Sequence, residues 1–315
     1  MSEKRIFTVA VVGPTASGKT DLAISIAKRF GGEIISADSM QIYKDMPIAT
    51  ACPDANQKEQ VVHHLVEFLD NSVSFSVAEY VTLASEKIEE INSRSKLPVI
   101  VGGTGLYIDS LLNNITFTAD KSNEELQRCL NEKYDAVGGE AMLKELSVFD
   151  SETAKRLHAN DRKRIIRAFE VYLNNGISIT KQNELSKLNP APYDTLYIGI
   201  TYKDREKLYE RINKRVDIML ENGILDEAVK CMNKGKTAKQ AIGHKEFIPY
   251  LNGEITLEEA TENLKRETRH YAKRQLTWFR KNSDINWIYA DCCDVEKTAI
   301  EIVKERISKE CKTSL

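Results

Sequence analysis

The chain of 315 residues is long enough for one large domain, or for a domain that carries a second one. Hydrophobic residues make up 42% of it and charged residues 29%, which is typical of a globular protein with a buried core. The net charge of −2 excludes a strongly basic protein, so any surface for nucleic acid must be local. No apolar stretch approaches the ~20 residues that cross a membrane, and we expect a cytoplasmic protein with no membrane partner.

The six cysteines are scattered, and none forms a C-x-x-C pair. A structural zinc site usually needs paired ligands at short spacing. We therefore expect free thiols in a reducing compartment and no zinc site.

The first hundred residues alternate between predicted strands and helices. An unbroken apolar run at 6–12 predicts a buried strand, and helical spacing of apolar residues predicts a helix over 20–30. Residues 33–37 predict a second strand. A capping box predicts a helix over 76–94, and residues 97–101 predict a third strand. This order is typical of a parallel α/β sheet.

The pattern changes after the third strand, because residues 120–185 contain no convincing strand. The capping box Ser122-x-x-Glu125 predicts the start of one helix, and residues 161–174 predict another. A strand is predicted at 196–200. We therefore predict a helical insertion at 119–195 within a core formed by 1–118 and 196–315.

The last third of the core is predicted to be mainly helical. Residues 204–222 form one helix that ends at a glycine, and a capping box at Thr256 opens a long helix to about residue 281. A final strand is predicted at 287–290.

The first strand leads into a complete phosphate-binding loop of the form G-x-x-x-x-G-K-T. The motif comprises Gly13, Pro14, Thr15, Ala16, Ser17, Gly18, Lys19 and Thr20. Its backbone N–H groups and the helix N-terminus favour phosphate, Lys19 adds a cation, and the Thr20 hydroxyl is a candidate ligand for Mg²⁺. The motif predicts that a di- or triphosphate binds, and it leaves open whether a phosphoryl group moves.

Two further candidate residues follow the second and third strands. Parallel sheets bind ligands at the carboxyl ends of their strands, which places Asp38 near the phosphate loop. Its carboxylate is a candidate Mg²⁺ ligand or general base, and the alternative is a cap for the next turn. Thr104 lies among three glycines and either holds a substrate, orients Asp38, or occupies a plain turn.

Basic residues gather in two places despite the acidic total. Residues 155–167 hold six basic residues and one acidic residue, and residues 263–281 hold seven and one. In the second cluster Leu264, Tyr271 and Trp278 recur every seven residues and predict an apolar stripe beside a basic face. Each cluster is either a solvated face or a surface for nucleic-acid phosphates.

Taken together, the motifs resemble the tRNA dimethylallyltransferase family of bacterial type. The matching segments are GPTASGKT at 13–20, ISADSMQIY at 35–43, HHLVEF at 63–68, VGGTGLY at 101–107, NDRKRIIRAFEVY at 160–172, QAIGHKE at 240–246 and YAKRQLTWFR at 271–280. They extend over nearly the whole chain in the family's order.

The resemblance implies a phosphate-loop α/β core with a helical insertion. It also implies transfer of the dimethylallyl group from dimethylallyl diphosphate to the exocyclic amine of the adenosine 3′ of the anticodon, with Mg²⁺. In that reaction Asp38 is the general base, Thr104 its partner, and Arg215 helps to bind the leaving pyrophosphate. The phosphate loop would then hold the diphosphate of the donor rather than ATP.

The resemblance further implies contacts with the anticodon arm of tRNA. The segments are Asp38, Ser39, Met40 and Gln41; Lys163, Arg164, Ile165, Ile166 and Arg167; Gln240, Ala241, Ile242, Gly243, His244 and Lys245; and Lys273, Arg274, Gln275, Leu276, Thr277, Trp278, Phe279 and Arg280. His244 departs from the family pattern, where a Tyr is expected, which puts one RNA contact in doubt. The C-terminal zinc finger of eukaryotic members is absent, and we expect a monomer.

Three other functions share parts of this pattern. A phosphate-loop kinase of a small metabolite has the loop and Asp38 but leaves both basic clusters unexplained. An adenylate isopentenyltransferase uses a free nucleotide as acceptor. A nucleotide-gated RNA-binding protein would bind RNA without either activity.

Overall fold

The computed structural model describes residues 5–113, 123–188, 190–232 and 241–313. By its contacts the chain divides into a first unit of residues 1–112 and 192–315 and a second unit of residues 113–191. The second unit thus begins at residue 113 and ends at residue 191, whereas the sequence predicted an insertion from 119 to 195.

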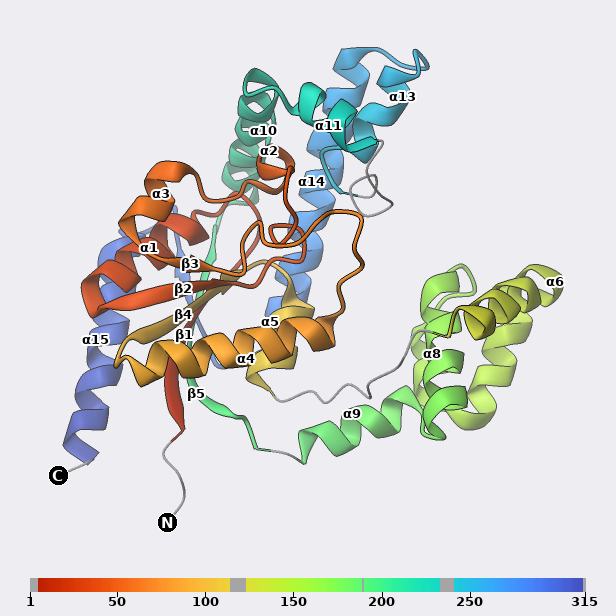
Figure 1. The fold of residues 1–315 in the computed structure, drawn as a ribbon, viewed down its shortest axis with the longest axis horizontal. Coiled ribbons are helices and arrows are strands. Elements are labelled where there is room, and N and C mark those ends of the chain that lie inside the picture. Colours follow the sequence, from red (N-terminus) through yellow and green to blue (C-terminus); the bar gives the residue numbers. More distant parts are fainter. Residues whose placement is uncertain (1–4, 114–122, 189, 233–240, 314–315) are drawn as a thin grey trace. The chain divides into compact units, whose positions relative to one another are not determined.

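Six parallel strands form the sheet of the first unit, in the order β3-β2-β4-β1-β5-β6 (Figure 1). Their bounds are β1 (Ile6–Val12), β2 (Gly32–Ser36), β3 (His63–His64), β4 (Leu97–Gly102), β5 (Tyr193–Thr201) and β6 (Ile285–Tyr289). The predicted parallel α/β fold is confirmed. Because β5 pairs with β1, the chain returns to the middle of the same sheet after the second unit.

Helices cover both faces of this sheet. Alternate side chains of a strand point to opposite faces, and in β1 Val9 and Val11 pack on one side while Ala10 and Val12 pack on the other. The first side is covered by α1 (Lys19–Phe30) and α15 (Val295–Thr313), and the second by α4 (Val77–Ser93) and α5 (Gly105–Leu112). The central strands β1, β2 and β4 are buried almost throughout on both faces, which explains why they read as continuous apolar runs.

Most of the remaining helices of the first unit gather beyond the carboxyl ends of the strands (Figure 1). They are α2 (Pro47–Thr50), α10 (Arg205–Glu221), α11 (Ile224–Met232), the 3₁₀ turn η1 (Lys245–Phe247), α13 (Ile248–Leu251) and α14 (Leu257–Phe279). The short helix α3 (Ala55–Gln60) lies beside α1 instead, where Lys28 donates to Gln60 at 3.1 Å. The predicted capping boxes at Ser76 and Thr256 both form, so the starts of α4 and α14 are confirmed.

The predicted apolar stripe of α14 is wrong in part. The buried face consists of Ala260, Leu264, Thr268, Ala272, Gln275 and Phe279. Leu264 belongs to it, but Trp278 is 37% exposed and donates a hydrogen bond to Asp109 Oδ2 at 2.7 Å. A seven-residue spacing drifts by about 20° per repeat on a straight helix, and small and amide side chains occupy the face that a count of apolar residues overlooks.

The second unit contains helices and no strand within residues 123–188, as predicted. Its helices are α6 (Glu124–Phe149), α7 (Ser151–Arg156), α8 (Arg162–Asn175) and α9 (Ile179–Lys187). Asn123 caps α6, one residue after the predicted Ser122, which lies outside the described residues. The helix breaks at Gly138 (φ 79°, ψ 162°), and its two parts pack on α8 around Leu130, Met142, Leu146, Ile165 and Phe169.

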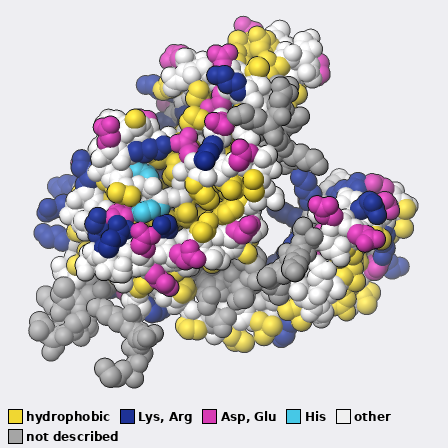
Figure 2. All heavy atoms as spheres, in the orientation of Figure 1, with side chains coloured by type: hydrophobic (Ala, Val, Ile, Leu, Met, Phe, Trp, Pro, Cys, Tyr) yellow, Lys and Arg dark blue, Asp and Glu magenta, His cyan; other side chains and the backbone are white. Residues whose placement is uncertain are grey.

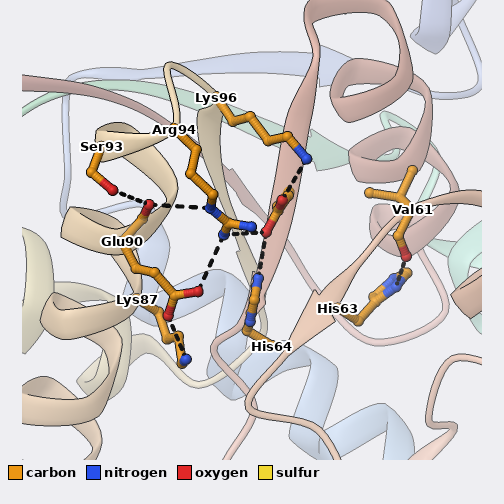
Figure 3. Close-up of polar contacts among 9 residues, drawn as sticks. Val61, His63, His64, Lys87, Glu90, Ser93, Arg94 and Lys96 are labelled. Atoms are coloured by element: carbon orange, nitrogen blue, oxygen red, sulfur yellow. Dashed lines mark hydrogen bonds and ion pairs between the residues drawn. The ribbon is translucent and has the colours of Figure 1, made fainter.

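A buried carboxylate on β2 contacts β3 and the turn that precedes β4 (Figure 3). Glu33 at the start of β2 accepts from Lys96 at 2.8 Å and from Arg94 at 2.9 Å, and its carboxylate lies 2.7 Å from His64 Nε2. Burial raises the pKa of Glu33, but hydrogen bonds from Lys96 and His64 and the charge of Arg94 outweigh it and lower the pKa to about 2. The contact with Glu33 gives His64 a structural role at this end of the sheet.

We predict that Glu33→Gln lowers the free energy of unfolding by about 2 kcal/mol at pH 7. The pKa shift alone corresponds to roughly 3 kcal/mol, but solvent screens Arg94 and Lys96, which are 43% and 44% exposed. Because the pKa of Glu33 is lowered in the folded state, this stability is present above about pH 4.5 and is lost as the pH falls toward 2.

Urea unfolding of both proteins between pH 7 and pH 3 measures the difference. Glu90→Gln is a control, since it removes a carboxylate of the same neighbourhood whose side chain is 46% exposed, and it should change stability far less. A difference that stays constant over this pH range would contradict the prediction.

Candidate active site

The phosphate loop runs from the end of β1 to the start of α1, as the motif requires. Gly13 has φ 145°, and a Cβ at this position would lie 2.4 Å from the carbonyl oxygen of Ile200, so only glycine lets the loop pass the end of β5. Lys19 folds back over the loop and donates to the Pro14 carbonyl at 2.6 Å. The loop therefore presents backbone N–H groups, a helix N-terminus and one ammonium group to the same space.

That space is a cavity of about 320 Å³ at the carboxyl ends of the strands. Its polar wall contains Lys19, Thr20, Asp38 and Arg215. Its apolar wall comes from four different segments and contains Ala49, Val216, Met219, Ile242 and Leu264. A cavity of this size with charged groups on one wall and hydrocarbon on the other suits a small ligand that has an anionic end and an apolar end.

Lys19 and Arg215, the two basic residues of the polar wall, would both be stabilised by a bound anion. Burial and the neighbouring guanidinium of Arg215 lower the pKa of Lys19 to about 7, and the carboxylate of Asp38 opposes them. Burial also lowers the pKa of Arg215. The Nε of Arg215 is buried and has no hydrogen-bond partner among the residues that the structure describes. Burial of the charged side chains of Lys19 and Arg215 costs free energy, and hydrogen bonds to an anion in the cavity would offset that cost.

Asp38 and Thr104 meet in the turns that follow β2 and β4. Asp38 Oδ1 accepts from the backbone N–H of Met40 at 2.9 Å, and the residue also lines the cavity, so the capping and the functional interpretations both hold geometrically. Thr104 Oγ1 accepts from the Ser39 N–H at 3.0 Å. The two candidate residues are thus tied together through Ser39.

Tyr271 on α14 is a site residue that the sequence analysis missed, because it was assigned to the apolar stripe. It lines the cavity. Burial and the charge of Asp38 raise the pKa of Tyr271, and hydrogen bonds with Thr104 and Gln275 oppose them. The phenol therefore stays neutral next to Asp38 and Thr104, where it provides an uncharged donor.

A buried acid holds the apolar wall in place. The carboxylate of Glu227 on α11 accepts from the backbone N–H of Ile48 at 2.8 Å and of Ala49 at 2.9 Å, and it lies 2.9 Å from His244 Nε2. His244 is 2% exposed. The side chain of His244 thus supports the wall from inside and does not reach the surface.

The other predicted RNA-contacting residues divide between surface, cavity and core. Those on the surface are Lys163, Arg164 and Arg167 of α8, Lys245, and Lys273, Arg274, Thr277, Trp278 and Arg280. Those that line the cavity are Asp38, Ser39, Met40, Gln41, Ala241, Ile242 and Gln275. Ile165, Ile166 and Phe279 are core residues, Gly243 is buried, Leu276 is half-buried, and Gln240 lies outside the described residues. The buried side chains point into the fold in this structure, so they are not part of the exposed surface.

Charges on the molecular surface are mixed. On the face drawn in Figure 2, basic and acidic side chains alternate over both units without a large field of one sign. This agrees with the net charge of −2.

The site suits a magnesium ion that is held mainly by phosphate. Among the described residues no group of three or more His, Cys, Asp or Glu side chains is placed to bind a metal. Mg²⁺ needs no such cage, because it commonly takes one or two protein oxygens and completes its shell with phosphate and water. Thr20 supplies an oxygen at the cavity wall beside the phosphate loop, which fits this pattern.

Comparison with known proteins places the chain in a family. Residues 41–282 match the model of the IPP transferase family. A tRNA dimethylallyltransferase of Acetivibrio thermocellus is 48% identical over 300 residues, which cover 94% of this chain and 96% of that protein. The chain belongs to the IPP transferase family. The resemblance to tRNA dimethylallyltransferases that the motifs indicated is confirmed.

Solved structures of this family have the same fold. A tRNA isopentenylpyrophosphate transferase of Bacillus halodurans is 39% identical, with a TM-score of 0.72 over 99% of each chain. A eukaryotic dimethylallyltransferase acting on tRNA is 30% identical, with a TM-score of 0.82 over 96% of this chain and 80% of that one. In the described part of this family member, no helix is long and apolar enough to cross a bilayer.

We predict that Lys19 makes anion binding depend on pH. Lys19→Met should weaken the binding of inorganic pyrophosphate about 10- to 100-fold at pH 6, the range for loss of a charged hydrogen bond. The ratio between the two proteins should shrink toward pH 8.5, because Lys19 with a pKa of about 7 has then lost its proton before binding.

Calorimetric titrations with pyrophosphate from pH 6 to 8.5 measure the ratio of the two dissociation constants. Because both proteins bind the same ligand at each pH, the ionisation of pyrophosphate itself does not affect this ratio. Lys28→Met on the exposed side of α1 is the matched control and should leave affinity unchanged. A ratio that is independent of pH would disprove the role given to the Lys19 proton.

Proposed function

We propose that this protein transfers the dimethylallyl group of dimethylallyl diphosphate to the exocyclic amine of the adenosine 3′ of the anticodon in tRNA. One observation carries the proposal: a single cavity joins an anion-binding wall, formed by Lys19 and Arg215, to Asp38 and to an apolar wall. Such a cavity matches a donor with a diphosphate at one end and a five-carbon hydrocarbon at the other. The names of a relative and of a solved structure agree with dimethylallyl as the transferred group and tRNA as the acceptor.

The diphosphate of the donor would lie against the phosphate loop, between Lys19 and Arg215. The buried Nε of Arg215 would gain the partner that it lacks among the described residues. Thr20 and the diphosphate oxygens would hold Mg²⁺, which neutralises negative charge on the leaving group. The two cations act in the same direction, because charge develops on the oxygen that departs.

The chemical step exchanges one bond for another. The carbon–oxygen bond of the donor breaks, pyrophosphate keeps the electron pair, and the adenine nitrogen bonds to the allylic carbon. The nitrogen loses a proton as it bonds, and Asp38 accepts it through the oxygen that does not cap the Met40 N–H. Thr104 and Tyr271 hold the position of the amine next to Asp38.

The target base must leave its stack to enter this cavity. The exposed basic residues of α14 lie on the helix whose opposite face lines the cavity, so they are placed to bind the RNA backbone around an extruded base. We propose that α8, with exposed Lys163, Arg164 and Arg167, binds the anticodon arm as well. The proposal includes a cytoplasmic, monomeric enzyme.

Incubation with labelled dimethylallyl diphosphate and unmodified tRNA tests the function directly. Label in the tRNA, at the adenosine next to the anticodon, is the expected result. ATP turnover with a small acceptor and no label in tRNA would favour a kinase instead. Label in free AMP alone would favour an adenylate isopentenyltransferase, and RNA binding without any transfer would favour a binding protein.

We predict that Asp38→Asn lowers the single-turnover rate by about 10²- to 10⁴-fold, the usual effect of removing a general base. Asparagine keeps an oxygen for the Met40 N–H, so the turn should stay intact. The dissociation constant for tRNA should change little. A rate within threefold of the unaltered protein would remove Asp38 from the role of base.

We predict that Lys273→Gln with Arg280→Gln weakens tRNA binding and leaves pyrophosphate affinity unchanged. Both side chains are exposed on α14, seven residues apart. Each phosphate contact that is lost should lower the slope of log affinity against log salt by about 0.7–0.9. Filter binding at several salt concentrations measures this slope, and circular dichroism checks folding.

The matched control replaces two exposed lysines with the same seven-residue spacing on α15, Lys297→Gln with Lys304→Gln. It removes the same net charge from another helix. If the α14 and α15 double variants lost equal affinity, the effect would come from net charge and not from a contact surface.

A further inference from the structure

One buried amide joins three separate parts of the site. Gln275 lies on the buried face of α14 and is 5% exposed. Its Oε1 accepts from the backbone N–H of Thr15 in the phosphate loop at 2.8 Å, and its Nε2 donates to the carbonyl of Gly103 at 3.0 Å. The partners are 260 and 172 residues away in the sequence. The amide therefore fixes the phosphate loop and the turn that precedes Thr104 to one helix.

The space around this amide is shaped for it. A Cβ at residue 103 would lie 2.1 Å from Nε2 of Gln275, so glycine is needed there for the helix to approach. The two backbone groups require an acceptor and a donor on the same side chain, and only an amide provides both without charge at this length. An apolar replacement would leave a buried N–H and a buried carbonyl without these partners, which is costly.

A second side chain holds the neighbouring residue of the loop. The Nε of Arg211 on α10 donates to the Ala16 carbonyl at 2.9 Å. Ala16 has φ 62°, in the left-handed region that alanine rarely adopts. The strained tip of the loop, Thr15-Ala16, is thus held by α10 and α14 from outside the motif, and its shape depends on both helices.

We propose that Gln275 is a positioning residue for the diphosphate of the donor, which rests on the proposed function. It sets the phosphate loop and the Gly103-Thr104 turn at a fixed separation, so that the carbon released from the diphosphate lies next to Asp38 and Thr104. This role differs from the tRNA contact that the sequence resemblance implied for residue 275.

The test compares Gln275→Met with the unaltered protein. Methionine has nearly the same shape and fills the space, but it provides no amide. We expect the dissociation constant for inorganic pyrophosphate with Mg²⁺ to rise about tenfold, KM for the donor to rise similarly, and kcat to fall. The dissociation constant for tRNA should stay within twofold. A merely structural role would lower the melting temperature without this separation of donor from tRNA.

Thr261→Val is the matched control. It removes a side-chain hydrogen bond, from Thr261 Oγ1 to the Leu257 carbonyl, on the same helix and away from the cavity. It should leave pyrophosphate and tRNA binding unchanged. If Gln275→Met behaved like this control, the proposal would be overturned.

Gly103→Ala keeps the proposal testable if Gln275→Met folds poorly, because it displaces the amide without removing it. It should weaken pyrophosphate binding and leave tRNA binding within twofold. Unchanged pyrophosphate binding in a folded Gly103→Ala protein would overturn the proposal. Pyrophosphate binding needs no prenyl transfer, so these results stand or fall separately from the labelling experiment that tests the proposed function.

Discussion

The parallel pairing of β2 with β4 extends beyond the strands, and the site depends on it. The Ala37 N–H donates to the Val101 carbonyl at 2.7 Å, and the Thr104 N–H donates to the Ala37 carbonyl at 3.2 Å. These bonds bring together two turns that are more than sixty residues apart in the sequence. Asp38 lies in one turn and Thr104 in the other, so the backbone itself, before any ligand binds, brings the acid at the cavity wall close to the hydroxyl behind it.

Local signals in the sequence were enough for much of the fold. The phosphate loop and the capping boxes at Ser76 and Thr256 are formed by residues within a few positions of one another. Their spacing in the sequence alone therefore predicts the loop and the starts of two helices. The central strands are buried on both faces of the sheet, so each one is a continuous apolar run that can be recognised from its own residues.

What the sequence did not predict depends on distant partners. Gln275 and His244 are polar, and polarity alone places them at the surface. They are buried because Thr15, Gly103 and Glu227 satisfy them from other parts of the chain. The apolar wall of the cavity is likewise assembled from four segments that are far apart in the sequence, so the pattern within any one of them does not predict the wall.

The lowered pKa of Lys19 also couples anion binding to proton uptake. Since Lys19 has a pKa of about 7, its ammonium group is only partly protonated at neutral pH in the empty site. A polyanion stabilises the charged form, so capture of one draws up to one proton from the solution, and its departure returns that proton. Each cycle of binding and release is therefore coupled to the exchange of a proton with the buffer, and buffers of different ionisation enthalpy should report different apparent heats for the same event.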